Sequence, residues 1–278
     1  MTPAPGDPAL STAIAAARRA RALIMAAADD PTSWQVRAKR PNDFVTQVDL
    51  ASERVIVETL LLAFPGHAVR GEESPHAHGQ AGSEHVWIVD PLDGTRNFIH
   101  GYPAYSVSIA LAVRGVVEHG VVIDVVNDRL YHASRGQGAW CDGRRLKVSP
   151  RATLAESLIG TSCPIRPGPG QARDLARLHA VLAAAGGIRR SGSAALDLAW
   201  VAAGACDGFF DAGLSAWDVA AGGLLVAEAG GQVGDFSGRP DYLEARECMA
   251  GPPALFAELR ALFASPALAA AAPGTPLA

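Results

Sequence analysis

Residues 87–101 read W-I-V-D-P-L-D-G-T-R-N-F-I-H-G, and the fold and chemistry of the chain can be inferred outward from them. The apolar run predicts a strand over residues 86–89, after which two carboxylates, Asp90 and Asp93, follow three positions apart. Two acids clustered at the end of an apolar strand repel each other, so they need a cation or hydrogen-bond donors nearby. A charged turn exposed to water is the alternative interpretation of this pair.

The turn after this strand combines stiffness with accessible backbone. Pro91 fixes one backbone angle, Gly94 permits close approach to the main chain, and Thr95 can cap a helical turn over residues 96–99. Divalent cations prefer carboxylate oxygens, whereas phosphate oxygens prefer free backbone N–H groups. The residues themselves therefore indicate metal-dependent phosphoryl chemistry.

The composition is that of an ordinary soluble globular protein. The 278 residues are 49% hydrophobic and 19% charged, with a formal net charge of −4, which favours neither a nucleic-acid partner nor an anionic membrane. The four cysteines are far apart in the sequence, so we expect reduced thiols and a cytoplasmic location. The N-terminus lacks a signal-peptide layout, and no apolar run approaches the roughly 20 residues of a membrane span.

Hydrophobic periodicity and turn residues predict a mixture of helices and strands. Helices are expected at residues 9–28, 44–63, 172–185, 193–203, 217–229 and 252–263. Strands are expected at residues 67–70, 86–89, 105–114, 116–126, 130–134, 158–162, 206–211, 232–235 and 248–250, and a loop or hairpin at 31–43. Because the strands come in blocks, an α+β fold of packed layers is favoured over a doubly wound sheet. Residues 1–7 and 265–278 are predicted to be disordered tails.

Further acids are expected where a strand or a helix begins or ends: Asp49, Glu72, Asp211 and Asp218. Asp218 is explained equally well as a first-turn acid that the helix dipole favours. Glu72 is followed by Glu73, and such a pair is by itself more typical of a solvated loop. These acids become informative only together with the D-P-L-D-G-T turn.

Three motifs together resemble the signature set of the inositol monophosphatase family: G-E-E-S at 71–74, W-I-V-D-P-L-D-G-T-R-N-F at 87–98, and W-D-V-A-A-G-G at 217–223. This family belongs to the lithium-sensitive, Mg²⁺-dependent phosphatases. The motifs follow the family's order, and the resemblance extends from about residue 9 to residue 263. It implies a layered α/β/α/β/α sandwich in one domain, residues 8–264, which is often a homodimer.

The resemblance also implies a site for two to three Mg²⁺ ions. Glu72, Asp90 and the backbone carbonyl of Leu92 match the ligands of the first ion. Asp90, Asp93 and Asp218 match those of the second, with Asp90 as the bridge. Glu72 and water molecules would hold a weaker third ion, so Glu72 also counts among the catalytic residues.

Further roles follow from the same resemblance. Asp49 would pair with Thr95 to polarise the attacking water, and the N–H groups of Gly94 and Thr95 would bind the phosphate. Asp93 and Asp211 are expected on the substrate side of the site, where Asp211 would contact hydroxyl groups. The segment that lines the polyol of the substrate is expected to comprise Gly192, Ser193 and Ala194.

The predicted substrate is a small phosphate monoester, with inositol 1-phosphate as the first candidate. Asn97-Phe98 favours this branch of the family, whereas Arg96 also occurs in relatives that act on histidinol phosphate or sulfated nucleotides. Asp211 stands where the family's inositol phosphatases usually have Glu. Histidinol phosphate and 3′-phosphoadenosine 5′-phosphate are therefore the alternative substrates. The resemblance also allows a non-enzymatic interaction partner of proteins or RNA machinery, against which the intact acidic set argues.

Overall fold

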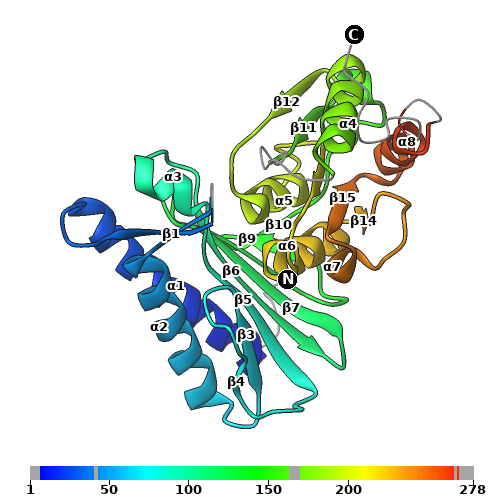
Figure 1. Cartoon of the computed structure of the whole chain (residues 1–278). Helices are drawn as coiled ribbons and strands as arrows, with labels where there is room; N and C mark the ends of the chain where they lie inside the picture. Colours follow the sequence, from blue (N-terminus) through cyan, green and yellow to red (C-terminus); the bar gives the residue numbers. More distant parts are fainter. Residues whose placement is uncertain (1–6, 41–42, 163–169, 266–267, 269–278) are drawn as a thin grey trace.

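The computed structural model describes residues 7–40, 43–162, 170–265 and 268. Its architecture confirms the predicted α+β fold, a layered α/β/α/β/α sandwich (Figure 1). The layers are α1 (Pro8–Asp29) with α2 (Gln47–Ala63), an eight-stranded sheet, α5 (Ala194–Ala202) with α6 (Ala216–Glu228), a five-stranded sheet, and α4 (Gln171–Ala184) with α8 (Pro253–Phe263). Two shorter helices are α3 (Thr95–His100) and α7 (Tyr242–Ala245).

The eight-stranded sheet has the order β10-β9-β8-β7-β6-β5-β3-β4 and is antiparallel except between β3 and β5. Its strands are β3 (Ala68–Gly71), β4 (His78–Gly79), β5 (His85–Asp93), β6 (Ser106–Val113), β7 (Val116–Asp124), β8 (Arg129–Ser134), β9 (Ala139–Cys141) and β10 (Arg144–Arg145). Strand β5 lies inside this sheet, which explains why its sequence is almost continuously apolar.

The five-stranded sheet has the order β12-β11-β13-β15-β14, with parallel pairs at the β12 side and antiparallel pairs at the β14 side. Its strands are β11 (Leu158–Gly160), β12 (Gly187–Arg189), β13 (Gly208–Ala212), β14 (Gln232–Gly234) and β15 (Glu247–Gly251). A separate hairpin joins β1 (Val36–Arg40) to β2 (Asp43–Thr46). Residues 31–43 were predicted to form a loop or a hairpin, and the pairing of β1 with β2 shows a hairpin. Residues 41–42 lie outside the described part.

Both faces of β5 are buried in different apolar clusters. Trp87 and Val89 pack with residues of α1 and α2, whereas Ile88 packs with residues of α5 and α6. This alternation follows from the twofold side-chain period of a strand. The layers are thus held together through the strand that ends in the acidic turn.

Helix α6 packs unusually close to its neighbours because small residues leave no side chain between them. A Cβ added at Gly120 of β7 would lie 2.9 Å from the carbonyl oxygen of Ala221, and one at Gly222 would lie 2.6 Å from Cβ of Leu198 in α5. The small residues of W-D-V-A-A-G-G therefore let α6 lie between the sheet and α5. This packing sets the position of Asp218 in its first turn.

Several predicted boundaries were wrong. The second helix begins at Gln47 instead of Phe44, because Thr46 forms the N-cap and residues 43–46 form β2. The strand predicted over residues 86–89 continues to Asp93, so both acids lie within it. The sequence patterns missed short elements with few core residues: β4, β9, β10, β12 and α7.

The single domain predicted over residues 8–264 stays a prediction. Of the predicted tails, residues 1–6, 266–267 and 269–278 lie outside the described residues, whereas the side chain of Leu268 is buried. Within the described ranges, no helix combines the length and the apolar character needed to cross a membrane.

Candidate metal centre

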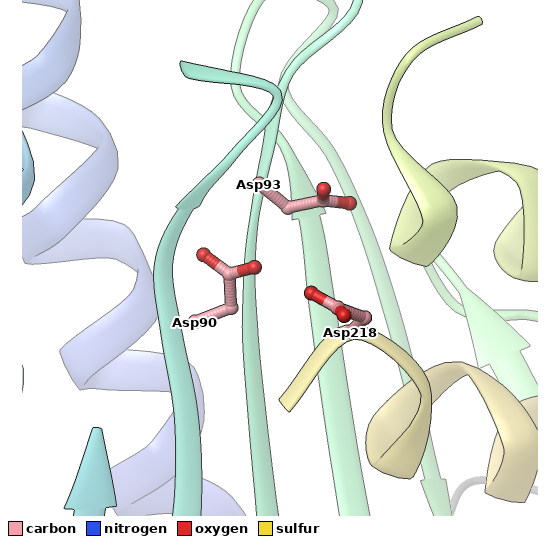
Figure 2. A group of neighbouring side chains, drawn as sticks. All are labelled: Asp90, Asp93 and Asp218. Atoms are coloured by element: carbon pink, nitrogen blue, oxygen red, sulfur yellow. The ribbon is translucent and has the colours of Figure 1, made fainter. Parts of the chain in front are cut away.

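Three carboxylates from two layers converge at one point (Figure 2). Asp90 and Asp93 come from β5, and Asp218 comes from the first turn of α6. Each offers one oxygen, and these oxygens lie within 4.8 Å of one another. The structure thus brings together three of the predicted metal ligands from positions far apart in the sequence.

An irregularity in β5 places Asp90 and Asp93 on the same side. On a regular strand, side chains three positions apart point to opposite faces. Here Asp90 pairs with Ser108 of β6 and Asp93 with Ser106, so three steps along β5 match two along β6. The intervening Pro91 cannot donate a ladder hydrogen bond, which suits a bulge. Both carboxylates therefore face Asp218.

The cluster is electrostatically unfavourable without a cation. Burial raises the pKa of Asp90 well above its ordinary value of 3.8, and the charges of Glu72, Asp93 and Asp218 raise it further. Burial also raises the pKa of Asp93 to about 6, against the hydrogen bonds from Ser193 and Ala195. A divalent cation would remove this cost by replacing protons. A set of carboxylate oxygens without His or Cys fits Mg²⁺.

Glu72 and Leu92 are the two other predicted ligands, and both lie next to Asp90. The backbone N–H of Glu72 donates to the carbonyl of Val89 at 3.1 Å, which places Glu72 beside Asp90. The N–H of Leu92 donates to Oδ1 of Asp90 at 3.0 Å and so orients that carboxylate. The carbonyl oxygen of Leu92 lies 3.1 Å from Oγ1 of Thr95. Both residues therefore lie beside Asp90, although the group of converging carboxylates comprises only Asp90, Asp93 and Asp218 among the described residues. The binding of metal by Glu72 and Leu92 stays a prediction.

Asp49 and Thr95 form a pair next to the acidic turn. Oδ1 of Asp49 accepts a hydrogen bond of 2.7 Å from the Thr95 hydroxyl, while Oδ2 accepts the N–H and hydroxyl of Thr46. Burial raises the pKa of Asp49, although these hydrogen bonds oppose the shift. The predicted capping role of Thr95 was wrong: the N-cap of α3 is Gly94, whose φ of 97° favours glycine, and the threonine hydroxyl is directed to Asp49 instead.

The N-terminus of α5 holds Asp93. The hydroxyl of Ser193 donates to Oδ2 of Asp93 at 2.6 Å, and the N–H of Ala195 donates to the same oxygen at 2.8 Å. These hydrogen bonds fix the orientation of the Asp93 carboxylate. The segment Gly192, Ser193 and Ala194 thus lies at the site, while its contact with a substrate stays a prediction.

Asn97 has a structural role that the sequence did not reveal. Its amide nitrogen donates to the carbonyl oxygens of Ala104 and Ser191, at 2.6 and 2.8 Å. A Cβ at Gly192, where φ is 87°, would also lie 3.0 Å from this amide. Asn97 therefore ties the turn after β5 to the loop before α5.

Asp211 of β13 and Asp197 of α5 are two further buried acids, and the charges of Asp93 and Asp211 both act on Asp197. Oδ2 of Asp211 accepts the N–H of Ser162 at 3.0 Å and Oδ1 accepts its neighbour's N–H, while burial raises the pKa of Asp211 to about 7. Asp197 of α5 is fully buried, and the Ser191 side chain is the hydrogen-bonding group beside its carboxylate. Burial raises the pKa of Asp197 well above 3.8. In the sequence, Asp197 is recognisable only as a single acid inside an apolar helix. The contact of Asp211 with the polyol of the substrate stays a prediction.

A cavity of about 460 Å³ lies elsewhere, near the beginning of β5. His67, His85 and His119 line it together with the start of α1. Since β5 rises about 3.3 Å per residue, this cavity is remote from Asp93 at the strand's other end. None of the predicted site residues lines it.

Comparisons with known proteins find relatives along nearly the whole chain. The model of the inositol monophosphatase family matches residues 6–265. A Pseudomonas aeruginosa protein named Nus factor SuhB is 46% identical over 248 residues, which cover 88% of this chain and 92% of that protein. An inositol-1-monophosphatase of Mesorhizobium japonicum is 43% identical over 242 residues, which cover 87% and 91%.

A solved structure of similar sequence has the same fold. The crystal structure of the extragenic suppressor protein suhB from Bartonella henselae superposes with a TM-score of 0.90 at 39% identity, covering 94% of this chain and 100% of that one. The match of the family model spans nearly the whole chain, and the acids of its motifs converge in space. This chain therefore belongs to the inositol monophosphatase family.

Proposed function

We propose that this chain is a Mg²⁺-dependent phosphatase of small phosphate monoesters, with inositol 1-phosphate as its first candidate substrate. The observation that carries this proposal is the convergence of Asp90, Asp93 and Asp218 next to the hydrogen-bonded pair of Asp49 and Thr95. Hydrolysis of a phosphate monoester is among the slowest uncatalysed reactions, so the site must stabilise a large developing charge.

Two cation positions are proposed around Asp90. Glu72, Asp90 and the Leu92 carbonyl would hold the first, and Asp90, Asp93 and Asp218 the second, with Glu72 and water holding a weaker third. Bound there, the cations would supply Lewis-acid stabilisation to the attacking and leaving oxygens and lower the pKa of water.

The chain's own groups would orient the attack. The Thr95 hydroxyl directs its proton to Asp49 at 2.7 Å, which leaves a lone pair on the threonine oxygen to accept a hydrogen bond from the attacking water. The proton released from this water would pass through Thr95 to the Asp49 carboxylate. The first N–H groups of α3, including those of Gly94 and Thr95, have no partner within the helix and would donate to phosphate oxygens.

The loop before α5 and the end of β13 would contact the rest of the substrate. Ser193 holds Asp93 and belongs to the segment proposed to line the polyol, so substrate binding and ligand geometry would be linked there. Asp211 would contact hydroxyl groups. Histidinol phosphate and 3′-phosphoadenosine 5′-phosphate are the alternative substrates. A homodimer and lithium sensitivity stay predictions from the resemblance, and a cytoplasmic location stays a prediction from the separated cysteines.

A second function as an interaction partner is favoured by the names of several relatives. The Pseudomonas aeruginosa protein and one from Escherichia coli, 42% identical over 246 residues, are both named Nus factor SuhB. An interaction protein need not keep a complete ligand set, and here the acids of all three motifs are present. We therefore rank the enzymatic function first.

A metal titration with a panel of phosphate monoesters tests this ranking. We expect phosphate release that requires Mg²⁺, is fastest with inositol 1-phosphate among the three substrates, and is lost in Asp218→Asn. Fastest turnover of histidinol phosphate or the nucleotide would replace the substrate but keep the enzyme class. No release from any ester at saturating Mg²⁺ would favour the interaction function.

A further inference from the structure

The first turns of α2 carry three buried polar side chains on one face, next to the metal centre. Asp49, Ser52 and Glu53 lie three and four positions apart, hence on one face of the helix, and all three are buried. Asp49 holds Thr95, and the hydroxyl of Ser52 donates to the carbonyl of Pro91 at 2.8 Å. Glu53 contacts a different segment of the site, the loop after β3.

Glu53 binds that loop on both sides of Glu72. Oε2 of Glu53 accepts the backbone N–H of Glu73 at 2.8 Å, and Oε1 accepts the hydroxyl of Ser74. The Glu53 carboxylate also lies directly against Gly71, so closely that a Cβ at Gly71 would collide with it. Glu53, which is only 4% exposed, therefore lies against the residue before Glu72 and accepts hydrogen bonds from the two residues after it.

We propose that Glu53 is a positioning residue that fixes Glu72 for metal binding. This inference rests on the proposed metal-dependent function. Both carboxylate oxygens of Glu53 accept hydrogen bonds from the protein, so Glu53 acts through the loop and not as a ligand. It also explains why the first motif begins with glycine: Gly71 leaves the space that the Glu53 carboxylate occupies.

The arrangement favours a carboxylate. A glutamine at this position has the same size, but its single acceptor oxygen must take the N–H of Glu73, and its NH₂ group can face the Ser74 hydroxyl only if that hydroxyl becomes the acceptor. Both hydrogen bonds would then be neutral instead of charge-assisted, hence weaker, and Glu72 would be less often in its binding geometry. Changes to groups that orient metal ligands typically weaken metal binding about 10- to 100-fold.

The test measures Mg²⁺ binding to the full chain by calorimetry, without substrate. Glu53→Gln is compared with Glu58→Gln, which removes the same charge from an exposed position of the same helix. We expect at least about tenfold weaker binding in Glu53→Gln and unchanged binding in Glu58→Gln. In phosphate release, the Mg²⁺ concentration for half-maximal rate should rise by the same factor, while the rate at saturating Mg²⁺ falls far less.

A double-mutant cycle separates positioning from a general structural effect. If Glu53 acts through Glu72, then Glu53→Gln should have almost no further effect on Mg²⁺ affinity in a Glu72→Gln background. The proposal would be overturned if Glu53→Gln weakened Mg²⁺ binding equally with Glu72 and with Glu72→Gln. It would also be overturned if the Glu53→Gln and Glu58→Gln variants bound Mg²⁺ with equal affinity.

A second variant tests the role of Glu53 if Glu53→Gln is unfolded, and the wild type tests the phosphatase function separately. If Glu53→Gln does not fold, Ser74→Ala removes one of the two donors without burying a new group, and unchanged Mg²⁺ affinity in this variant would overturn the proposal. Wild-type protein that binds Mg²⁺ but hydrolyses no ester would refute the phosphatase function alone, since the calorimetric comparison still decides the role of Glu53. Wild-type protein that binds no Mg²⁺ would refute both.

Discussion

Asp90 occupies the least favourable position for a negative charge in the metal centre. It is 1% exposed, and Glu72, Asp93 and Asp218 all raise its pKa. Replacement by asparagine should therefore stabilise the metal-free protein while removing the proposed bridge. We expect Asp90→Asn to raise the melting temperature without metal and to lower phosphate release by at least about 10³-fold at saturating Mg²⁺.

Asp235 provides a control, because its pKa is lowered whereas that of Asp90 is raised. Burial raises its pKa, but hydrogen bonds from Ser237 and Arg239 outweigh this and lower it to about 2. Asp235→Asn should therefore lower the melting temperature and leave turnover unchanged when the protein is folded. A melting temperature of metal-free Asp90→Asn below that of the wild type would contradict the proposed repulsion in the cluster.

We expect the Thr95 hydroxyl to contribute to the rate of the chemical step more than to substrate binding. Its role would be realised as the water attacks, so Thr95→Ala is expected to lower kcat by about 10²-fold or more with a much smaller change in KM. Thr95→Ser keeps the hydroxyl and should restore most of kcat. Steady-state kinetics with saturating Mg²⁺ checks this, and equal kcat values for Thr95→Ala and the wild type would exclude the pair from the mechanism.

At the level of single residues, the sequence indicated the acids but not the groups that hold them. Asp90 and Asp93 are recognisable because two acids after an apolar run need a compensating partner. Ser193 and Asn97 are not, because Ser193 bonds to Asp93 at a separation of 100 positions and Asn97 bonds to Ser191 at 94. No local pattern encodes such contacts, because serine and asparagine are common in turns whether or not they bond to a distant segment.

Among the elements, α6 links packing to the metal centre. It lies against β7 at Gly120, where an added Cβ would lie 3.0 Å from the Cα of Ala221. Gly120→Val should push α6 outward, displace Asp218, and destabilise the fold by about 1–3 kcal/mol. We expect both a lower melting temperature and weaker Mg²⁺ binding, measured by thermal denaturation and calorimetry.

Gly66 provides the matched control for this element. A Cβ there would meet only the side chain of Gln80, at an ordinary distance of 3.7 Å. Gly66→Val makes the same substitution away from α6 and should leave Mg²⁺ affinity unaltered. Wild-type Mg²⁺ affinity in folded Gly120→Val would show that α6 does not position Asp218.

Long elements were predictable from sequence and their ends were less so. The helices that begin near residues 9 and 217 have long apolar or small-residue runs, and both were found. The second helix was predicted to begin at Phe44 because apolar periodicity continues through β2, whereas the capping pair of Thr46 and Asp49 sets the true start at Gln47. The bulge in β5 escaped prediction because it depends on the register with β6.

For the whole molecule, the raised pKa values couple stability to pH and metal. The folded-state pKa values of Asp90 and Asp93, the latter about 6, exceed the ordinary 3.8. The folded chain therefore binds more protons than the unfolded chain above pH 3.8, and metal-free stability should fall as pH rises through these values. Bound Mg²⁺ replaces the protons and should reverse the loss.

Thermal denaturation with and without saturating Mg²⁺ measures this coupling. We expect the increase in melting temperature caused by Mg²⁺ to be small near about pH 5 and to grow towards about pH 8. Asp90→Asn should show a weaker dependence because one of the coupled groups is gone. An increase that is independent of pH would mean that the cation does not displace protons from these carboxyls.

The central claim is that the carboxylates of β5 and α6 hold a pair of cations bridged by Asp90. The most direct test is anomalous diffraction from crystals of the protein grown with Mn²⁺, which takes the same oxygen ligands as Mg²⁺. Two anomalous peaks about 3.5–4 Å apart are predicted, both within bonding distance of Asp90, with Asp218 on only one of them. Crystals with Mn²⁺ at concentrations that support turnover but with no peak between β5 and α6 would contradict the account.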